Sequence, residues 1–198
     1  MLKSLEERVS VLENELKKIK SENFKKLSKL LGVGDTFELA GYNWKILEIT
    51  EEGYKCLADR LDESMEFDSN SNDWRKSELR EYLNNDFFDA LGENIGKKYI
   101  LPFHRDLMSL DGQIEYGTCT DKVSLLTVDE YRKYRDLIPN TDYWWWLISP
   151  WSTPCNDDET SVTVVSSSGN FGINVCDYDD GVRPFCILSS EIFVSKGE

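Results

Sequence analysis

The stretch W-R-K-S-E-L-R-E-Y-L-N, residues 74–84, opens a helical pattern that runs over residues 77–91. Its apolar side chains recur at spacings of three and four, which places them on one face of a helix. This face consists of Leu79, Tyr82, Leu83, Phe87 and Phe88. The pattern therefore predicts an amphipathic helix.

The segment before this helix is typical of antiparallel strands. Residues 35–41 and 42–49 alternate polar and apolar side chains, residues 51–53 form a turn signal, and residues 54–58 predict a third strand. Within the second strand we expect Trp44, Leu47 and Ile49 to point inward, with Ile46 out of step. Three such strands separated by short turns predict a β-meander.

The segment after the helix contains a second helix and further strands. Thr127 followed by Glu130 is a capping box, which predicts a helix beginning near Thr127. Residues 62–73 are acidic and loop-like, and from Trp144 onward short strands alternate with turns. No linker rich in Pro, Gly or Ser divides residues 35–198, so we expect one α+β domain.

The overall charge excludes several classes of partner. The chain has 198 residues, 37 acidic against 23 basic, and a net charge of −14. Binding to nucleic acid or to anionic membrane surfaces requires clustered Lys and Arg, so we expect neither. No apolar run approaches the ~18 residues that span a bilayer, which predicts no membrane insertion. The first residues lack the apolar core of a secretory signal, so we expect a protein made in the cytoplasm without a classical signal peptide.

The five cysteines predict free thiols. Cys56, Cys119, Cys155, Cys176 and Cys186 are widely spaced and form no Cys-x-x-Cys pair. An odd count without a signal peptide favours a reducing compartment. One disulfide among the last three cysteines is the alternative.

Residues 1–31 predict a coiled-coil oligomerisation helix. Their apolar residues are spaced three, four, three, four and three, which is the a/d pattern of a heptad. The seam consists of Leu2, Leu5, Val9, Leu12, Leu16 and Ile19. An amphipathic helix folded back on its own domain is the alternative, because periodicity alone does not separate the two.

The charges beside the seam favour a parallel assembly. Arg8 at position g faces Glu13 at position e of a neighbouring in-register chain, an attractive pair. The segment R-V-S-V-L-E, residues 8–13, resembles a short trimerisation motif of coiled coils, in which the Arg stem packs over the core while its head pairs with Glu. We therefore expect a parallel homotrimer, with a dimer as the alternative.

Within the predicted domain, residues 32–198, about residues 32 to 194 resemble a known family. The blocks at residues 34–37, 42–47, 124–127, 164–169 and 181–184 look like its strand and turn motifs. Residues 74–84 resemble its W-x-x-S-x-L-R-x-W-L-N helix with Tyr82 in place of Trp, and residues 146–150 resemble W-L-R-S-P with Ile148 in place of Arg. These blocks are typical of the C-type-lectin-like domains of phage, prophage and gut-bacterial proteins, which overlap the variable proteins of diversity-generating retroelements and are related to the formylglycine-generating-enzyme fold.

The resemblance implies a fold and a setting. It implies an α+β C-type-lectin-like domain carried by the N-terminal coiled coil, in a phage, prophage or gut bacterium, with association to a virion as one setting. In this family the C-terminal region forms the display surface, and in retroelement-linked members some of its codons are varied. We expect Trp74, Arg80, Trp144, Trp146 and Arg183 to be scaffold residues, Arg183 being paired with a carboxylate or carbonyl groups.

Residues 143–180 are the candidate ligand-binding surface. They combine aromatic side chains with Ser, Asn and Asp, a composition typical of a paratope. Trp145 is included because strand alternation places it opposite Trp144 and Trp146. The predicted contact residues are Tyr143, Trp145, Trp151, Ser152, Asn156, Asp157, Ser168, Asn170, Phe171, Asn174 and Tyr178. A solvated loop region without a ligand is the alternative.

We expect no cofactor, no metal and no catalysis. Residues 156–159 and 177–180 carry oxygen ligands that suit calcium, but they match neither the sugar-binding lectin motifs nor an EF-hand. His104 is the only histidine, and no catalytic motif surrounds it. The sequence therefore predicts a non-enzymatic, multivalent protein that binds an unknown protein or glycan. The alternatives are an assembly component of a phage or other particle and a cysteine oxidase using Cys176 and Cys186.

Overall fold

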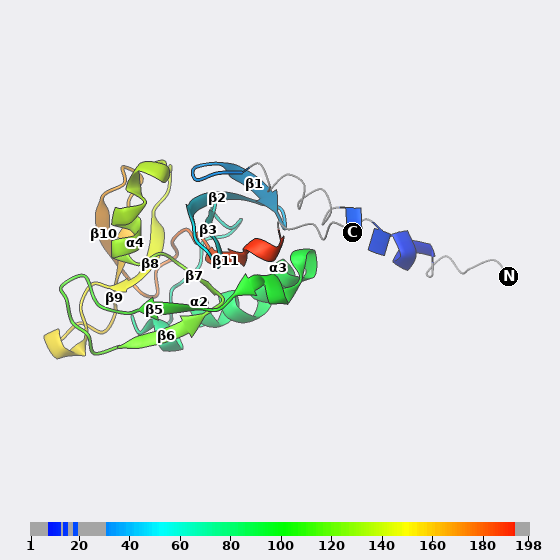
Figure 1. Ribbon diagram of the computed structural model, residues 1–198. Coiled ribbons are helices and arrows are strands. Elements are labelled where there is room, and N and C mark those ends of the chain that lie inside the picture. Colours follow the sequence, from blue (N-terminus) through cyan, green and yellow to red (C-terminus); the bar gives the residue numbers. More distant parts are fainter. Residues whose placement is uncertain (1–7, 13, 16–17, 20–30, 193–198) are drawn as a thin grey trace.

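The computed structural model describes residues 8–12, 14–15, 18–19 and 31–192. Within this part the protein has an α+β fold, as predicted. Figure 1 shows a central sheet with helices α2 and α3 on one side and a second, smaller sheet at one end, beside α4. The candidate site lies at the smaller sheet.

The central sheet is antiparallel and contains the predicted meander. Its neighbouring strands pair in the order β1-β2-β3-β11-β4, and β7 also pairs with β11. The strands are β1 (Thr36–Leu39), β2 (Tyr42–Ile49), β3 (Gly53–Ala58), β11 (Phe185–Ser189), β4 (Ile100–Leu101) and β7 (Val123–Ser124). The last strand, β11, thus lies in the middle of the sheet, which closes the fold by joining both ends of the domain.

The inward pattern predicted for β2 is wrong at two positions, Ile46 and Ile49. Ile46 and Leu47 are both buried, whereas Ile49 is 43% exposed. The register between β2 and β3 shifts between Ile46 and Glu48, which marks a β-bulge. The extra residue turns the side chains after it to the opposite face, so strict alternation fails there.

The predicted helix over residues 77–91 is confirmed, with a change of pitch in the middle. The short turn η1 (Trp74–Lys76) leads into α2 (Glu78–Tyr82), a π-helical turn η2 (Leu83–Phe87) and α3 (Phe88–Ile95), followed by the turn η3 (Lys97–Tyr99). Ser77 is the N-cap of α2, since its hydroxyl accepts a hydrogen bond from the backbone N–H of Arg80 at 3.2 Å. The predicted apolar face points into the core, where Leu79, Leu83, Phe87 and Phe88 are buried.

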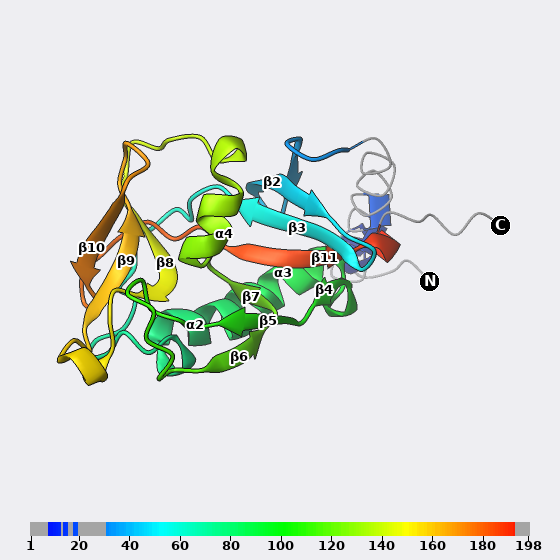
Figure 2. The same ribbon diagram turned by 60° about the vertical axis from the view of Figure 1, so that its left-hand side comes forward.

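One buried carboxylate fastens this helix to the neighbouring hairpin. Asp121 lies at the end of β6 (Thr118–Asp121), which pairs with β5 (Phe103–Asp106). Its carboxylate accepts from Nε1 of Trp74 at 2.8 Å and from Nε of Arg80 at 2.6 Å. Asn84 adds a second link, donating to the carbonyl of Val123 at 2.8 Å. The motif in residues 74–84 therefore supplies three side chains, those of Trp74, Arg80 and Asn84, that hold the helix against β6 and β7. Figure 2 shows α2 beside β6.

The small sheet has the order β10-β9-β8 and is covered on both faces at β8. Trp146 belongs to the larger core cluster, and its ring centroid lies 5.8 Å from that of Phe67. Trp145 belongs to the second cluster, 5.6 Å from the ring of Tyr131. The strands are β8 (Trp145–Pro150), β9 (Ser161–Val165) and β10 (Phe171–Val175).

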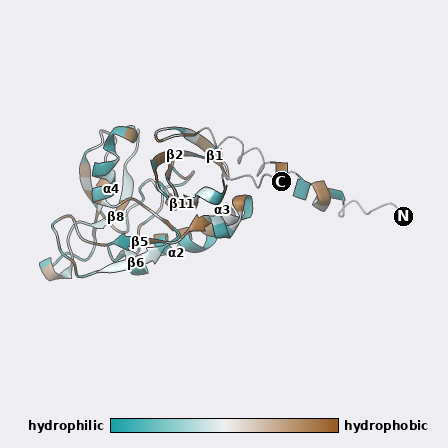
Figure 3. Cartoon of the chain, in the orientation of Figure 1, coloured by the Kyte–Doolittle hydropathy of each residue, from teal (hydrophilic) through white to brown (hydrophobic). Residues whose placement is uncertain are grey.

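The predicted capping box is confirmed at the start of α4 (Val128–Lys133). Thr127 Oγ1 accepts from the N–H of Glu130 at 3.1 Å, and the Glu130 carboxylate accepts from the N–H of Thr127 at 2.9 Å. Three short turns complete the structure, η4 (Arg135–Leu137), η5 (Pro154–Asn156) and η6 (Ser190–Ile192). In Figure 3 β5 is mainly hydrophilic, because three of its four residues are His104, Arg105 and Asp106.

Arg183 is a scaffold residue, as predicted. It is buried, and its Nε donates to the carbonyl of Ala58 at 3.2 Å while its guanidinium lies 4.9 Å from the ring centroid of Trp145. Backbone hydrogen bonds from Ala58 to Pro184 and from Leu61 to Val182 fix the same segment. Residues 181–184 thus join the two sheets.

All five cysteines are free, so the disulfide alternative does not hold in this structure. Cys56 and Cys186 face each other across β3 and β11, and both are buried. In the part of the chain that the structure describes, no helix is both long and apolar enough to cross a membrane.

Residues 8–12, 14–15 and 18–19 of the N-terminal segment are helical, whereas Leu31, the last residue of the predicted coiled-coil segment, is not. Val9, Leu12 and Ile19 of the predicted seam are 45%, 63% and 54% exposed in the single chain, so the domain does not cover them. Arg8 is also helical and exposed. The other predicted oligomerisation residues, Leu2, Leu5, Glu13 and Leu16, lie outside the described residues.

The Asp121 contact gives a stability prediction. Asp121→Ala leaves the Arg80 guanidinium and the Trp74 N–H without their acceptor, so we expect the free energy of unfolding to fall by about 3 kcal/mol. Asp89→Ala is the control, because its ion pair with Lys97 is more than half exposed on both sides and should contribute less than about 1 kcal/mol. Urea denaturation of both variants measures the difference. Equal losses would contradict the role of Asp121.

Candidate ligand-binding site

The structure divides the predicted contact residues among three places. Trp151, Ser152, Asn156 and Asp157 lie around η5, whereas Ser168, Asn170 and Phe171 lie at the turn between β9 and β10. Tyr143, Asn174 and Tyr178 line a common cavity. Trp145 is buried in the core.

Two of the residues around η5, Ser152 and Asn156, connect this segment to the loop that contains Asp111. Asp111 accepts hydrogen bonds from Oγ of Ser152 at 2.7 Å and Nδ2 of Asn156 at 2.9 Å, and also from the Ser109 hydroxyl. The hydrogen bonds from Ser109 and Ser152 lower the pKa of Asp111 to about 2. Asp157 adopts the left-handed conformation, with φ of 54°, at the end of η5. Ser152 is buried, and of these residues Trp151 offers the largest apolar surface to solvent.

The turn between β9 and β10 packs against the helical segment after Thr127. The carbonyl of Gly169 accepts from the Tyr131 hydroxyl at 2.8 Å, and the carbonyl of Ser168 accepts from Nδ2 of Asn140 at 3.0 Å. Asn170 donates to the Ser168 hydroxyl at 3.1 Å. Phe171 stacks edge-on against Tyr131, with ring centroids 5.5 Å apart. The contacts of Ser168, Asn170 and Phe171 are therefore made within the chain and stabilise this turn.

The third group lines a cavity of about 400 Å³ between the start of β8 and the segment after β10. Three aromatic side chains contribute to its wall, together with an amide and two carboxylates. The lining residues are Ser64, Tyr143, Trp144, Asn174, Tyr178, Asp179, Asp180 and Gly181. Trp144 and Tyr178 are 42% and 57% exposed, so their rings are accessible from solvent. An open hollow with apolar walls and a few polar groups is the usual form of a ligand site.

Two glycines make room for the aromatic rings. A Cβ at Gly172 would lie 2.8 Å from Cζ3 of Trp144, and a Cβ at Gly181 would lie 2.7 Å from Cδ2 of Tyr143. Both distances are shorter than carbon atoms tolerate, so the rings occupy space that any other residue would fill. Gly172 and Gly181 therefore set where Trp144 and Tyr143 lie.

Asp180 is the buried polar group of the cavity. It is 6% exposed, and Oδ2 accepts from Nδ2 of Asn174 at 2.5 Å. Its backbone pairs with that of Met65 in both directions, at 3.0 and 3.2 Å. Burial is the main cause that raises the pKa of Asp180, and the hydrogen bond from Asn174 only partly opposes it. The cavity thus holds a carboxylate that has lost part of its hydration.

Of the three consecutive tryptophans, Trp146 is buried in the core as predicted, but the expectations for Trp144 and Trp145 are wrong. Trp145 is 1% exposed, whereas Trp144, expected in the scaffold, is 42% exposed. Alternation along a strand predicts one covered and one open face, but β8 packs against core clusters on both faces. Trp144 precedes the strand, and its ring turns out over Gly172. The exposure of Trp144 could not be predicted from neighbouring residues, because its ring lies over Gly172 in β10.

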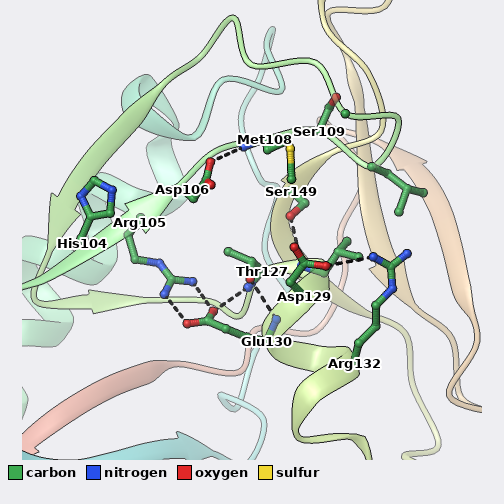
Figure 4. A pocket seen from close by; sticks show the side chains of 13 residues that line it. His104, Arg105, Asp106, Met108, Ser109, Thr127, Asp129, Glu130, Arg132 and Ser149 are labelled. Atoms are coloured by element: carbon green, nitrogen blue, oxygen red, sulfur yellow. Dashed lines mark hydrogen bonds and ion pairs between the residues drawn. The ribbon is translucent and has the colours of Figure 1, made fainter.

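A second cavity, of about 310 Å³, lies between β5 and the start of α4 (Figure 4). Four of its charged side chains form ion pairs, Arg105 with Glu130 and Arg132 with Asp129. The buried Arg105 pairs with both carboxylate oxygens of Glu130, at 2.7 and 2.6 Å, and donates to the carbonyl of Leu125. Burial raises the pKa of Glu130, but the charge and hydrogen bonds of Arg105 outweigh it, so the pKa is lowered. This group stabilises the junction of β5 and α4.

The groups considered for catalysis are not brought together. His104 lines the second cavity but is exposed, and within the described residues no side-chain hydrogen bond joins it to a serine or cysteine. Burial raises the pKa of Cys176 to about 11 and also raises that of Cys186. A thiol with a raised pKa is a poor nucleophile at neutral pH.

The acidic loops do not converge on one point. Across residues 31–192 and the described part of the N-terminal helix, no three His, Cys, Asp or Glu side chains gather as a metal site. Of the calcium candidates, Asp158 instead accepts backbone hydrogen bonds from Thr160 and Ser161. Asp179 and Asp180 line the aromatic cavity.

Comparison with known proteins gives one match. The model of a family described as a domain of unknown function (DUF6273) matches residues 109–190. No curated protein and no solved structure matches the chain. The matched segment contains every predicted contact residue and most of the aromatic cavity, but not the helix that begins at Ser77.

The environment of Asp180 gives a prediction on stability. A carboxyl group whose pKa is raised by folding costs stability once it ionises, and this cost disappears as pH falls through the raised pKa. We therefore expect Asp180→Asn, which keeps an oxygen for Asn174, to leave the free energy of unfolding at pH 7 unchanged or higher. Denaturant melts at pH 7 and pH 4 measure this. A variant less stable at pH 7 would show that the carboxylate stabilises the fold.

Proposed function

We propose that this protein is a non-enzymatic, multivalent binding protein. In this proposal, an N-terminal parallel coiled coil, trimeric or alternatively dimeric, carries C-type-lectin-like domains that bind a ligand through the aromatic cavity. The observation that supports it most is the cavity itself, where Tyr143, Trp144 and Tyr178 surround Asn174 and Asp180. Exposed aromatic rings beside a few fixed polar groups are typical of binding surfaces.

The arrangement of the chain supports display. In both Figure 1 and Figure 2 the sheet β8–β10 lies at one end of the molecule and the described helical residues of the N-terminal segment lie at the other. A stalk at the end opposite to the ligand site leaves the site open to a target. Several domains held on one stalk convert modest single-site affinity into avidity.

The N-terminal helix supports self-association. Val9, Leu12 and Ile19 are exposed in the single chain, although their heptad spacing predicts one apolar stripe. A short helix is marginal alone, so burying this stripe between chains is the expected source of its stability. Arg8 is helical and exposed, so it is free to make the pairing that the trimerisation motif predicts.

The motif residues support the lectin-like resemblance, because each has a defined task. Trp74, Ser77, Arg80 and Asn84 cap the helix or attach it to β6 and β7. Arg183 joins the two sheets. The resemblance further suggests a phage or prophage origin and a virion as one setting. The raised thiol pKa values and the isolated His104 support a function without catalysis.

The oligomeric proposal predicts a solution mass. Multi-angle light scattering of the full chain should give three times the monomer mass of 22.9 kDa. Val9→Asp places a charge in the seam and should give a monomer, because a buried unpaired charge is costly. Val11→Asp is the matched control, since this valine lies off the seam at position c, and it should stay trimeric. A wild-type monomer, or equal effects of the two substitutions, would contradict the coiled coil.

The binding proposal predicts which surface holds the ligand. On arrays of immobilised peptides and glycans, the full chain should bind a subset of spots. The double variant Trp144→Ala with Tyr178→Ala should lose at least about tenfold in affinity for them, as expected for interface aromatic residues. Trp151→Ala changes a similarly exposed tryptophan at η5 and should bind normally. Equal loss for Trp151→Ala would assign binding to the wider predicted surface, and binding to no spot would favour an assembly component.

A further inference from the structure

The charge of the aromatic cavity narrows the kind of ligand that fits it. Its lining contains the carboxylates of Asp179 and Asp180, and no described Lys, Arg or His side chain lines it. The whole chain carries a net charge of −14. An anionic ligand would therefore be repelled both locally and at long range, whereas a cation would be attracted.

The aromatic rings favour the same kind of ligand. The faces of Trp and Tyr rings carry negative potential and attract ammonium and guanidinium groups. Tyr143 already makes such a contact within the chain, since the Arg60 guanidinium lies 4.9 Å from its ring centroid. Trp144 and Tyr178 are exposed and line the cavity, so their rings are available to a group from outside.

The carboxylate of Asp180 indicates which kind of cationic ligand fits the cavity. Asn174 binds one oxygen of its carboxylate, and the other oxygen accepts no hydrogen bond from any residue that the structure describes. Asp180 is 6% exposed and lines the cavity, so a ligand there can reach this oxygen. A partly desolvated carboxylate is best satisfied by a charged N–H donor. A quaternary ammonium group has no N–H to offer, and a neutral sugar hydroxyl would leave the charge uncompensated. A guanidinium or primary ammonium group supplies both the donor and the charge.

We propose that the cavity binds a basic side chain, arginine or lysine, of a partner protein. This inference rests on the proposed binding function and names its ligand class. The cation would sit against Trp144 and Tyr178 and donate to the carboxylate of Asp180, with Asp179 at the rim. A cavity of about 400 Å³ is of a size to accept one such side chain.

The test titrates the full-length protein with N-acetyl-arginine amide and N-acetyl-lysine amide. Transverse-relaxation-optimised NMR spectra report the Trp144 indole and the Asn174 side-chain amide. N-acetyl-citrulline amide is the neutral isostere of the arginine probe, and we expect it to bind at least about tenfold more weakly. Higher ionic strength should weaken arginine binding, because the cavity is open to solvent.

Substitutions in the protein separate the contributions. Tyr178→Leu should weaken arginine binding about threefold, as expected for one cation–π contact at an exposed site. Asp180→Asn should weaken it by about tenfold or more. Gly172→Ala should also weaken it by displacing the Trp144 ring. Asp177→Asn is the matched control, because this exposed aspartate does not line the cavity, and its affinity should equal that of wild type.

Each other outcome overturns the inference in a recognisable way. Equal binding of the citrulline and arginine probes, or no saturable shift with either basic probe, would remove the cation site. Tighter binding of choline would assign the cavity to quaternary ammonium groups, and tighter binding of spermidine would assign it to a free polyamine. If the arrays give cavity-dependent binding while the arginine titration fails, the inference falls and the binding function stands. If the arrays also give none, both fall.

Discussion

The buried carboxylate of Asp121 is the contact on which the rest of the domain depends. It binds Trp74 and Arg80, which fixes the helix over residues 78–95 against the β5–β6 hairpin. The Trp74 ring contacts Phe67, with centroids 5.4 Å apart, and Phe67 contacts Trp146 in turn. The backbone of Trp146 donates to the carbonyl of Gly181. A continuous packed path therefore connects this carboxylate to the edge of the aromatic cavity.

The cavity combines a rigid floor with accessible walls. Asp180 and Gly181 are fixed by backbone hydrogen bonds to Met65 and Trp144, and both are buried. The rings of Trp144 and Tyr178 stand out from this floor toward solvent. A site whose polar groups are already in place loses less entropy on binding, which favours affinity from a small contact area. Burial of the Asp180 carboxylate lowers the stability of the fold, and such a loss is common where function opposes stability.

Much of the scaffold could be predicted from the sequence, because it depends on local patterns. The meander follows from alternation, the helix after Trp74 from its apolar face, and the start of α4 from the pair Thr127 and Glu130. The position of the site could not be predicted in the same way. Trp144 and Trp145 exchange their expected environments because core clusters cover both faces of β8. The contact of Asp121 could not be predicted either, since its partners Trp74 and Arg80 lie 47 and 41 positions earlier in the chain.

The central claim is that a self-associating stalk holds several cavities open toward a common target. A crystal structure of the full chain tests it most directly. The account predicts parallel helices with Val9 and Leu12 at their shared axis, and cavities at the opposite end that remain free of contacts between chains. Helices that pack Val9 and Leu12 against their own domain, or an assembly that buries Trp144 and Tyr178 between chains, would contradict it.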